Sequence, residues 1–306
     1  MIVLPAGLTH RPLRRDDATA VFDLIATSER ALIGTVAIEE ADIVGHWSRP
    51  SFDIAASTIG VFEADELLGY AEVGGPGRGD ASVHPDHLGR GIGTVLAGWM
   101  QDTARAQGQD EIGMPVPEGS PGERLLRALG YGTRWTAWVL ALPGDRRIEA
   151  PVLPDGYVLR IALEEDLADA FTVTEDAFLE WSVRPRQEYA DWAATVVGRP
   201  GHEPWHLQVV ADAEGAIVGA VQASLDQNGG GFVHRVAVRA DQRGRGIARA
   251  LLAAAFGAAR ERGARRSELS TDSRTGALDL YLGLGMEVES TWVNLGISLV
   301  PPSDAG

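Results

Sequence analysis

One segment occurs twice in this chain of 306 residues, and no other sequence feature restricts the possible fold as strongly. The first copy is V-H-P-D-H-L-G-R-G-I-G at 83–93, and the second is V-R-A-D-Q-R-G-R-G-I-A at 238–248. Gly91 and Gly246 are 155 positions apart, and the same offset separates Gly130 from Gly285 in two later Leu-Gly corners. An offset that is kept over some forty residues predicts one structural unit that has been duplicated.

The duplication predicts two tandem domains. We expect an N-terminal domain at 1–143, a linker at 144–155 that is rich in proline and glycine, and a C-terminal domain at 156–306. In the second half, apolar periodicity predicts strands at 157–161, 207–210, 216–223 and 232–238, a short strand around Leu269, and closing strands at 286–299. Helices are predicted at 164–177, from Ile247 onward, and at 277–284.

The first half repeats this order, with a hairpin around Asp65 and an amphipathic helix from Ile92 to Met100. Strands and helices in this order predict an α/β (α+β) fold class, in which each domain is a mixed central sheet flanked by helices.

Composition excludes several kinds of chemistry. The chain has no cysteine, so disulfides, thiolate metal sites and an acyl-cysteine intermediate are impossible, and we expect no metal site. It also contains no lysine, which excludes a lysine-bearing phosphate loop. A net charge of −16 disfavours nucleic acid as a partner and favours a cationic small substrate such as an amine.

We predict a cytoplasmic protein that does not interact with membranes. No apolar run approaches the roughly 18 residues of a membrane span, and residues 1–7 lack the basic region and long apolar stretch of a signal peptide.

The glycine-rich turn at 243–248 lies where a strand gives way to a helix. Glycines there let the backbone turn sharply, and the free N–H groups of the first helical turn attract an anion such as a pyrophosphate. Arg243 and Arg245 add positive charge. A dinucleotide-binding fold would place such a turn after the first strand of its domain, whereas here it follows the fourth. A tight turn without a ligand is the other alternative, and two copies at equivalent places disfavour it.

At this point the sequence resembles a known family. The run at 238–248 resembles the acetyl-coenzyme A motif of the GCN5-related N-acetyltransferase (GNAT) superfamily, and L-Y-L-G-L-G-M at 280–286 resembles that superfamily's late helix. The tandem arrangement is similar to mycothiol synthase and its actinobacterial relatives. The resemblance implies direct transfer of an acetyl group from acetyl-coenzyme A to an amine.

The resemblance also implies which residues bind the coenzyme. Backbone groups of Val236, Ala237 and Val238 would hold the pantetheine arm, and Arg274 could reach a phosphate. The pyrophosphate would lie at the turn formed by Arg243, Gly244, Arg245, Gly246, Ile247 and Ala248. The N-terminal counterparts are Val83, Gly89, Arg90, Gly91, Ile92 and Gly93.

Two residues are the catalytic candidates. The superfamily often has a tyrosine where Tyr281 stands, which implies that Tyr281 donates a proton to the departing thiolate. His234 is the candidate base, because it lies on the strand expected beneath the acetyl group and because histidine titrates near neutral pH. In the similar mycothiol synthases and histone acetyltransferases, a glutamate stands at the position of Phe232. The absence of this glutamate here disfavours mycothiol and histone tails as acceptors. Glu203, His202 and Asp226 remain alternative bases that would act through water.

The acceptor is expected to be a primary amine of a small molecule or peptide. Trp181, Trp192, Trp205, His202 and Glu203 are candidates for its pocket, although aromatic residues more often form the core. A non-catalytic acyl-coenzyme A sensor or scaffold is the alternative function. A tandem pair can act as a monomeric pseudo-dimer or form a homodimer.

The first half looks degenerate. At the offset of the repeat, Leu126 stands at the position of Tyr281 and Leu88 at the position of Arg243. Leucine cannot donate a proton, so we expect the chemistry in the C-terminal domain.

Overall fold

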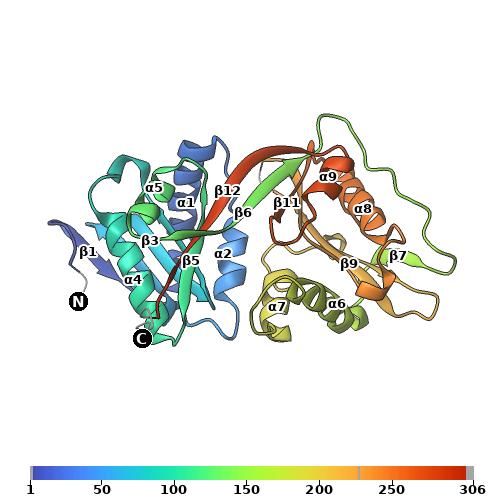
Figure 1. Cartoon of the computed structure of the whole chain (residues 1–306), viewed down its shortest axis with the longest axis horizontal. Coiled ribbons are helices and arrows are strands. Elements are labelled where there is room, and N and C mark those ends of the chain that lie inside the picture. The colour runs from blue at the N-terminus through green and yellow to red at the C-terminus, as the bar shows by residue number, and fades with distance from the viewer. Residues whose placement is uncertain (1–2, 227, 301–306) are drawn as a thin grey trace, which may run out of the picture. The chain divides into compact units, whose positions relative to one another are not determined.

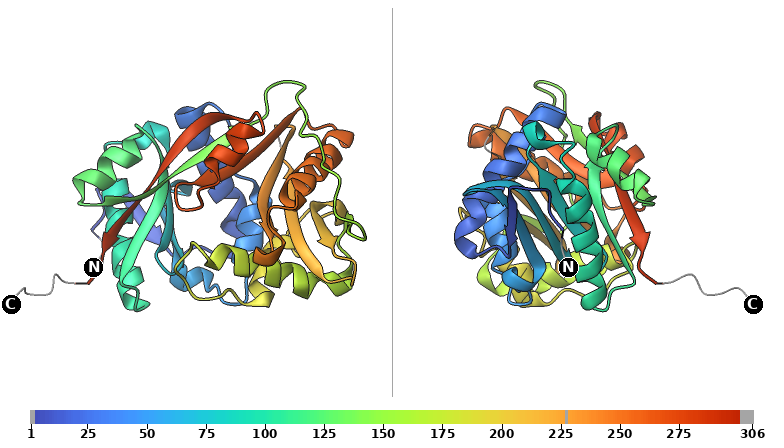
Figure 2. Two further views of the ribbon diagram at one scale, coloured as in Figure 1. Left: turned by 45° about the vertical axis from the view of Figure 1, so that its right-hand side comes forward. Right: turned by 90° about the vertical axis from the view of Figure 1, so that its left-hand side faces the viewer.

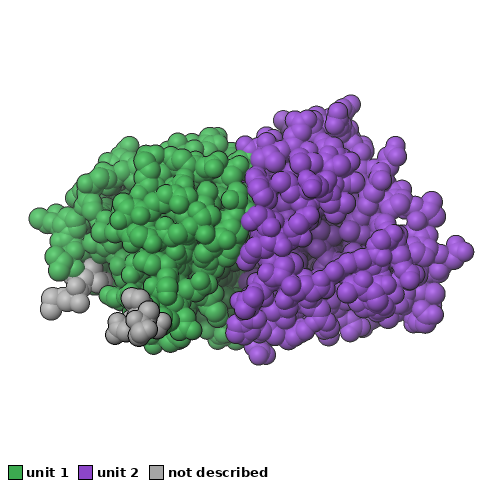
Figure 3. All heavy atoms as spheres, in the orientation of Figure 1, with its two compact units in different colours: residues 1–137, 290–306 green, residues 138–289 purple. Residues whose placement is uncertain are grey.

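The computed structural model describes residues 3–226 and 228–300 and divides the chain into two compact units. Unit 1 comprises residues 1–137 and 290–306, and unit 2 comprises residues 138–289 (Figure 3). Each unit contains a sheet with helices on both faces, which confirms the predicted mixed α/β class (Figure 1). None of the helices in the described part of the chain is long and apolar enough to cross a membrane.

The strands of unit 2 are hydrogen-bonded to one another in the order β6-β11-β10-β9-β8-β7. Neighbouring strands from β7 to β10 are antiparallel, and β10 pairs with β11 in parallel. The strands are β7 (Val158–Ile161), β8 (Leu207–Ala211), β9 (Ile217–Leu225), β10 (Gly230–Val238), β11 (Arg266–Asp272) and the end of β6 (Gly132–Ala141).

Helices cover both faces of this sheet (Figure 1). On one face, α8 (Ile247–Glu261) and α9 (Leu278–Gly283) share a core with strand residues such as Val233 and Val238. On the other face, α6 (Leu167–Leu179) and α7 (Tyr189–Val196) pack on Val209 and Ala237. The helices and strands predicted between 157 and 284 are therefore confirmed, with boundaries shifted by a few residues.

Unit 1 repeats the plan. Its antiparallel strands β1 (Leu8–Arg11), β2 (Thr58–Glu63), β3 (Glu66–Gly75) and β4 (Arg78–Val83) are ordered consecutively, and β5 (Glu111–Pro117) follows in the chain. One core lies under α4 (Ile92–Ala106) and α5 (Pro121–Ala128), and another under α1 (Ala18–Ile33) and α2 (Glu40–Trp47) (Figure 1 and Figure 2). A single turn of helix, α3 (Ile54–Ser57), precedes β2.

In each unit, a glycine of the sheet lets one helix pack closely on it, α4 in unit 1 and α8 in unit 2. A Cβ added to Gly219 would lie 2.8 Å from Ile247 Cγ2, so only glycine lets α8 pack this closely on β9. In unit 1, a Cβ on Gly69 would lie 2.6 Å from Ile92 Cγ2. Ile92 and Ile247 are the first residues of α4 and α8, so the duplication extends to the packing of side chains.

The boundaries of the units differ from the continuous domains expected at 1–143 and 156–306, because strands are exchanged. The expected closing strands form one long strand, β12 (Glu287–Ser298), whose residues from Trp292 onward pair with β5 of unit 1. Leu295 is fully buried in the unit 1 core. Conversely, Leu140 and Leu142 are buried in the unit 2 core. Which sheet a strand joins is decided by long-range packing, and the alternation of apolar residues is the same in either sheet.

Candidate active site

The glycine-rich turn of unit 2 has the backbone that the sequence predicted. Gly244 and Gly246 have φ of 77° and 80°, in the left-handed region that favours glycine. Gly246 is the N-cap of α8, so the first N–H groups of the helix are directed at the space beside the turn. Gly89 and Gly91 of unit 1 have nearly the same φ, 76° and 82°. Both turns can therefore present backbone donors to an anion.

The two arginines of the unit 2 turn have different partners. Arg243 donates from both Nη atoms to the carboxylate of Glu180, each at 2.7 Å, so its guanidinium is directed toward the end of α6. Arg245 is exposed and lies beside the turn, with its Nη1 3.5 Å from the hydroxyl of Tyr157. In unit 1, Arg90 is paired with Glu63 at 2.7 Å. Sequence reasoning missed Glu180 and Tyr157, since neither lies near the motif in the chain.

Strand β10 separates from β11 next to this turn. Their parallel pairing runs from Gly230 to Val233 and stops there, although β10 continues to Val238. A β-bulge interrupts the pairing with β9 between Val233 and Arg235, and 236–238 then pair with β9 alone. Within the described residues, the other edge of 236–238 has no strand partner, so its backbone groups can bind an extended ligand. This unpaired edge is formed by Val236, Ala237 and Val238, the residues that the resemblance implies for a pantetheine arm.

Tyr281 lies in α9 and is 8% exposed, in the core that also contains Val233 and Val238. Burial raises the pKa of its hydroxyl above the usual value of 10.0, so the tyrosine stays protonated at neutral pH. No other side chain of the described residues hydrogen-bonds to this hydroxyl. A protonated hydroxyl without a partner is suited to donate its proton to a leaving group.

His234 is the bulge residue of β10 and is half-buried. Its Nε2 lies 2.8 Å from Ser224 Oγ. Burial, reinforced by the charge of Arg199 and Arg235, lowers the pKa of His234 to about 3. The imidazole is therefore neutral at physiological pH, and it is a weaker base than the sequence alone suggested.

Two of the alternative bases, Asp226 and Glu203, make hydrogen bonds within their own turns. Asp226 Oδ1 accepts the N–H groups of Asn228 and Gly230, at 2.7 and 2.8 Å, and so closes the turn before β10. Glu203 is exposed and begins the short 3₁₀ turn 204–206, where its N–H donates to His206 Nδ1. Burial lowers the pKa of His202, and it lowers the pKa of His206 to about 4.

The tryptophans and Arg274 are placed differently from the expected acceptor and phosphate contacts. Trp192 and Trp205 are each 2% exposed and belong to the two cores of unit 2, so they do not line an open pocket. Arg274 donates to Asp272 at 2.6 Å and lies over the ring of Trp181, 4.7 Å from its centroid. That cation–π contact holds Arg274 at the end of β11.

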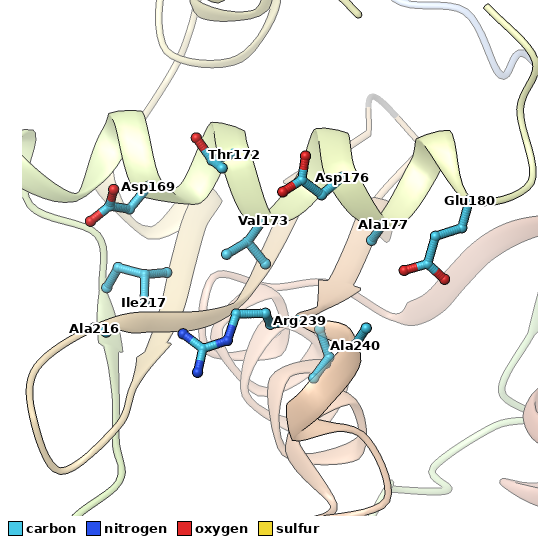
Figure 4. Close-up of a pocket in the computed structure, with 11 residues that line it drawn as sticks. Asp169, Thr172, Val173, Asp176, Ala177, Glu180, Ala216, Ile217, Arg239 and Ala240 are labelled. Carbon is cyan, nitrogen blue, oxygen red and sulfur yellow. The ribbon is translucent and has the colours of Figure 1, made fainter.

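A pocket of about 330 Å³ opens between α6 and the neighbouring ends of β9 and β10 (Figure 4). Its walls include the apolar side chains of Val173 and Ile217, and acidic side chains follow one side of α6 at Asp169, Asp176 and Glu180. The pocket lies on the β9 side of β10, whereas the unpaired edge of 236–238 faces the β11 side. Arg239 also lines the pocket, and Asp176 and Glu180 are ion-paired with Arg186 and Arg243, so the lining carries charges of both signs.

In unit 1, a buried polar network joins α2 to β3. Glu72 accepts a hydrogen bond from Trp47 Nε1 at 3.1 Å and lies 3.1 Å from His46 Nε2. Burial opposes ionisation of Glu72, but hydrogen bonds from His46, Tyr70 and Trp47 outweigh it and lower its pKa to about 2. The carboxylate therefore fastens α2 to β3. Leu126, at the position of Tyr281, is 3% exposed in the core.

The residues described by the structure contain no cluster of three or more histidine, cysteine or acidic side chains that could hold a metal ion. The arrangement of unit 2 instead offers an anion-binding turn, an unpaired strand edge and a protonated tyrosine. These are the parts needed to bind an acyl thioester and protonate its thiolate.

Comparison with known proteins agrees with this geometry. Residues 161–286 match the model of the acetyltransferase (GNAT) family. A mycothiol acetyltransferase of Thermobispora bispora is 32% identical over 242 residues, which cover 74% of this chain and 78% of that protein. The non-catalytic alternative has no support among these relatives.

Solved structures show the same fold along the whole chain. A GCN5-related N-acetyltransferase from Sphaerobacter thermophilus has a TM-score of 0.72 at 28% identity and covers 99% of both chains. A tandem GNAT protein of the clavulanic acid biosynthesis pathway also has a TM-score of 0.72, at 19% identity, over 97% of this chain and 100% of that one. The chain therefore belongs to the GNAT superfamily, as a tandem-domain, acyl-coenzyme A-dependent N-acetyltransferase.

Proposed function

We propose that unit 2 transfers an acetyl group from acetyl-coenzyme A directly to a primary amine of a small molecule or peptide. The observation that carries this proposal is the separation of β10 from β11 beside the glycine turn at 244–246. The turn would hold the diphosphate, and the unpaired edge of 236–238 would hold the pantetheine amides. Arg245 would add a positive charge to the diphosphate site.

The chemistry that we propose needs three proton transfers. The ammonium of the acceptor first loses one proton to solvent. The amine nitrogen then attacks the thioester carbonyl carbon, the C–S bond breaks, and Tyr281 gives its hydroxyl proton to the thiolate, while the second proton that the nitrogen loses restores the Tyr281 hydroxyl. Because the pKa of His234 is about 3, His234 would orient a water or the amine through its hydrogen-bonding nitrogens and would not hold the proton itself.

We propose a cationic acceptor. The chain carries a net charge of −16, and Asp169 lines the pocket beside α6 together with the ion-paired carboxylates of Asp176 and Glu180. The relative from Thermobispora bispora is named for mycothiol, whereas Phe232 disfavours that acceptor in this chain. A panel of amines should therefore include mycothiol-related compounds beside polyamines, amino sugars and peptides.

We assign turnover to unit 2 alone. Unit 1 has the leucine Leu126 in place of the proton donor, and its buried carboxylate Glu72 is engaged by three donors. Gly89, Arg90, Gly91, Ile92 and Gly93 would still let unit 1 hold a coenzyme without turnover.

Tyr281→Phe tests the proposal, because it keeps the ring packing and removes only the hydroxyl. We expect kcat to fall about 10²- to 10⁴-fold, while the Kd for acetyl-coenzyme A stays within about twofold. Steady-state kinetics and calorimetry measure the two effects. Tyr131→Phe is the matched control, since Tyr131 is a buried tyrosine of unit 1 whose hydroxyl lies 3.3 Å from Gln101 Nε2. Unchanged turnover in Tyr281→Phe would remove Tyr281 from the mechanism.

A further inference from the structure

The segment expected to be a plain linker is fastened across α8. We call residues 146–157 the strap. Arg249 Nε donates to the carbonyl of Glu149 at 2.8 Å, and Arg260 Nη2 donates to the carbonyl of Arg146 at 3.0 Å. Ile148 is buried in the same core as α8. The strap is therefore an ordered part of unit 2.

The strap also reaches the glycine turn. A Cβ added to Gly246 would lie 2.9 Å from Pro151 Cγ, so the strap packs directly against the turn. Tyr157, the last residue of the strap, donates its hydroxyl hydrogen to Gln242 Oε1 at 2.7 Å. Gln242 is 9% exposed and ends the 3₁₀ turn 240–242, which leads into Arg243.

One hydroxyl thus contacts both the side chain of Gln242, just before the turn, and the exposed arginine of the turn. The Tyr157 oxygen that donates to Gln242 also lies 3.5 Å from Arg245 Nη1, within reach of a weak hydrogen bond from the guanidinium. Among the residues that the structure describes, Tyr157 is the only side chain paired with Arg245. An arginine held beside its ligand loses less conformational entropy on binding than an arginine that moves freely.

Unit 1 lacks this connection. The sequence L-P-D-G-Y at 153–157 corresponds to L-P-A-G-L at 4–8, so Leu8 stands where unit 2 has Tyr157. The hydroxyl is therefore a feature of the unit that has the intact turn motif.

We propose that Tyr157 is a positioning residue of the coenzyme site, which holds the turn through Gln242 and orients Arg245 toward the diphosphate of the bound coenzyme. This inference rests on the proposed function of unit 2. It makes the strap part of the binding site, and it assigns a specific role to a residue outside the motif.

Tyr157→Phe tests the inference, because it removes the hydroxyl and keeps the ring. We expect the Kd for acetyl-coenzyme A, measured by calorimetry, to rise about three- to tenfold, as for the loss of one hydrogen bond. The loss should appear in the KM for acetyl-coenzyme A more than in kcat. Tyr131→Phe, which removes a hydroxyl in unit 1, should leave that Kd unchanged.

A double-mutant cycle separates positioning from a general structural effect. If Tyr157 acts through Arg245, Tyr157→Phe should weaken binding less in an Arg245→Gln background than in the wild type. An equal loss in both backgrounds, or no loss in either, would overturn the inference. Failure of the wild type to bind acetyl-coenzyme A would instead overturn the proposed function, so the two failures are distinguishable.

Discussion

At the scale of single residues, the two catalytic candidates of unit 2 are neutral at physiological pH. Burial raises the pKa of Tyr281, and it lowers the pKa of His234 to about 3. A neutral tyrosine can protonate a thiolate, and a neutral histidine can orient a hydrogen-bonding partner without introducing charge near the thioester. The sequence predicted both as catalytic candidates, but it did not reveal the protonation state of His234, because burial and the charge of Arg199 come from distant parts of the chain.

The low pKa of His234 makes stability depend on pH. The pKa is about 3 in the folded state and 6.5 in the unfolded state, so the unfolded state binds more protons between these values. The contribution is fully present above pH 6.5 and is lost as the pH falls toward 3, by at most about 1.4 kcal/mol per pH unit.

We therefore expect His234→Gln to lose less stability than the wild type between pH 6.5 and pH 4. Urea unfolding at a series of pH values measures this slope. A glutamine at exposed His10 should leave the slope unchanged. Identical slopes for His234→Gln and the wild type would show that His234 is not buried as described.

At the scale of helices and strands, the local elements follow from the sequence and their partners do not. Apolar periodicity predicted α8, the β8–β9 hairpin and the strand β10, because these patterns depend on neighbours along the chain. The exchange of β12 into unit 1 was not predictable, since Val293 and Leu295 alternate in the same way whichever sheet they join. The bulge in β10 also left no local signal.

Because β12 pairs with β5 of unit 1, we expect a substitution in the core-facing residues of β12 to destabilise unit 1. Leu295→Ala removes a fully buried side chain from the unit 1 core, so we expect a loss of about 2–5 kcal/mol in the stability of unit 1. Thermal unfolding measures the loss, and calorimetry below the transition should show the Kd for acetyl-coenzyme A within about twofold of the wild type. Loss of coenzyme binding in a folded Leu295→Ala protein would contradict the division of the chain into these units.

At the scale of the whole molecule, the two copies of the duplicated unit have diverged in sequence. Both copies keep the turn geometry, with Gly244 and Gly89 at φ of 77° and 76°. The copies differ in the groups around the turn, since unit 2 has Tyr281, whereas unit 1 has Leu126. The repeat let the sequence locate both turns and identify the half that lacks a proton donor. The contacts of Glu180 and Tyr157 with the turn were not predictable, because they join residues 63 and 88 positions away from their arginine partners.

Calorimetric titration of acetyl-coenzyme A into Gly244→Asp and Gly89→Asp tests directly whether the coenzyme binds to unit 2. The two glycines are matched, because a Cβ added to either would meet nothing within 4 Å and their φ values are nearly equal. We predict that Gly244→Asp raises the Kd for acetyl-coenzyme A at least about tenfold, or 1.4 kcal/mol, since a carboxylate would face the diphosphate. Gly89→Asp should leave this Kd unchanged. An unchanged Kd in Gly244→Asp, or a Kd raised tenfold in Gly89→Asp, would contradict the assignment of coenzyme binding and turnover to unit 2.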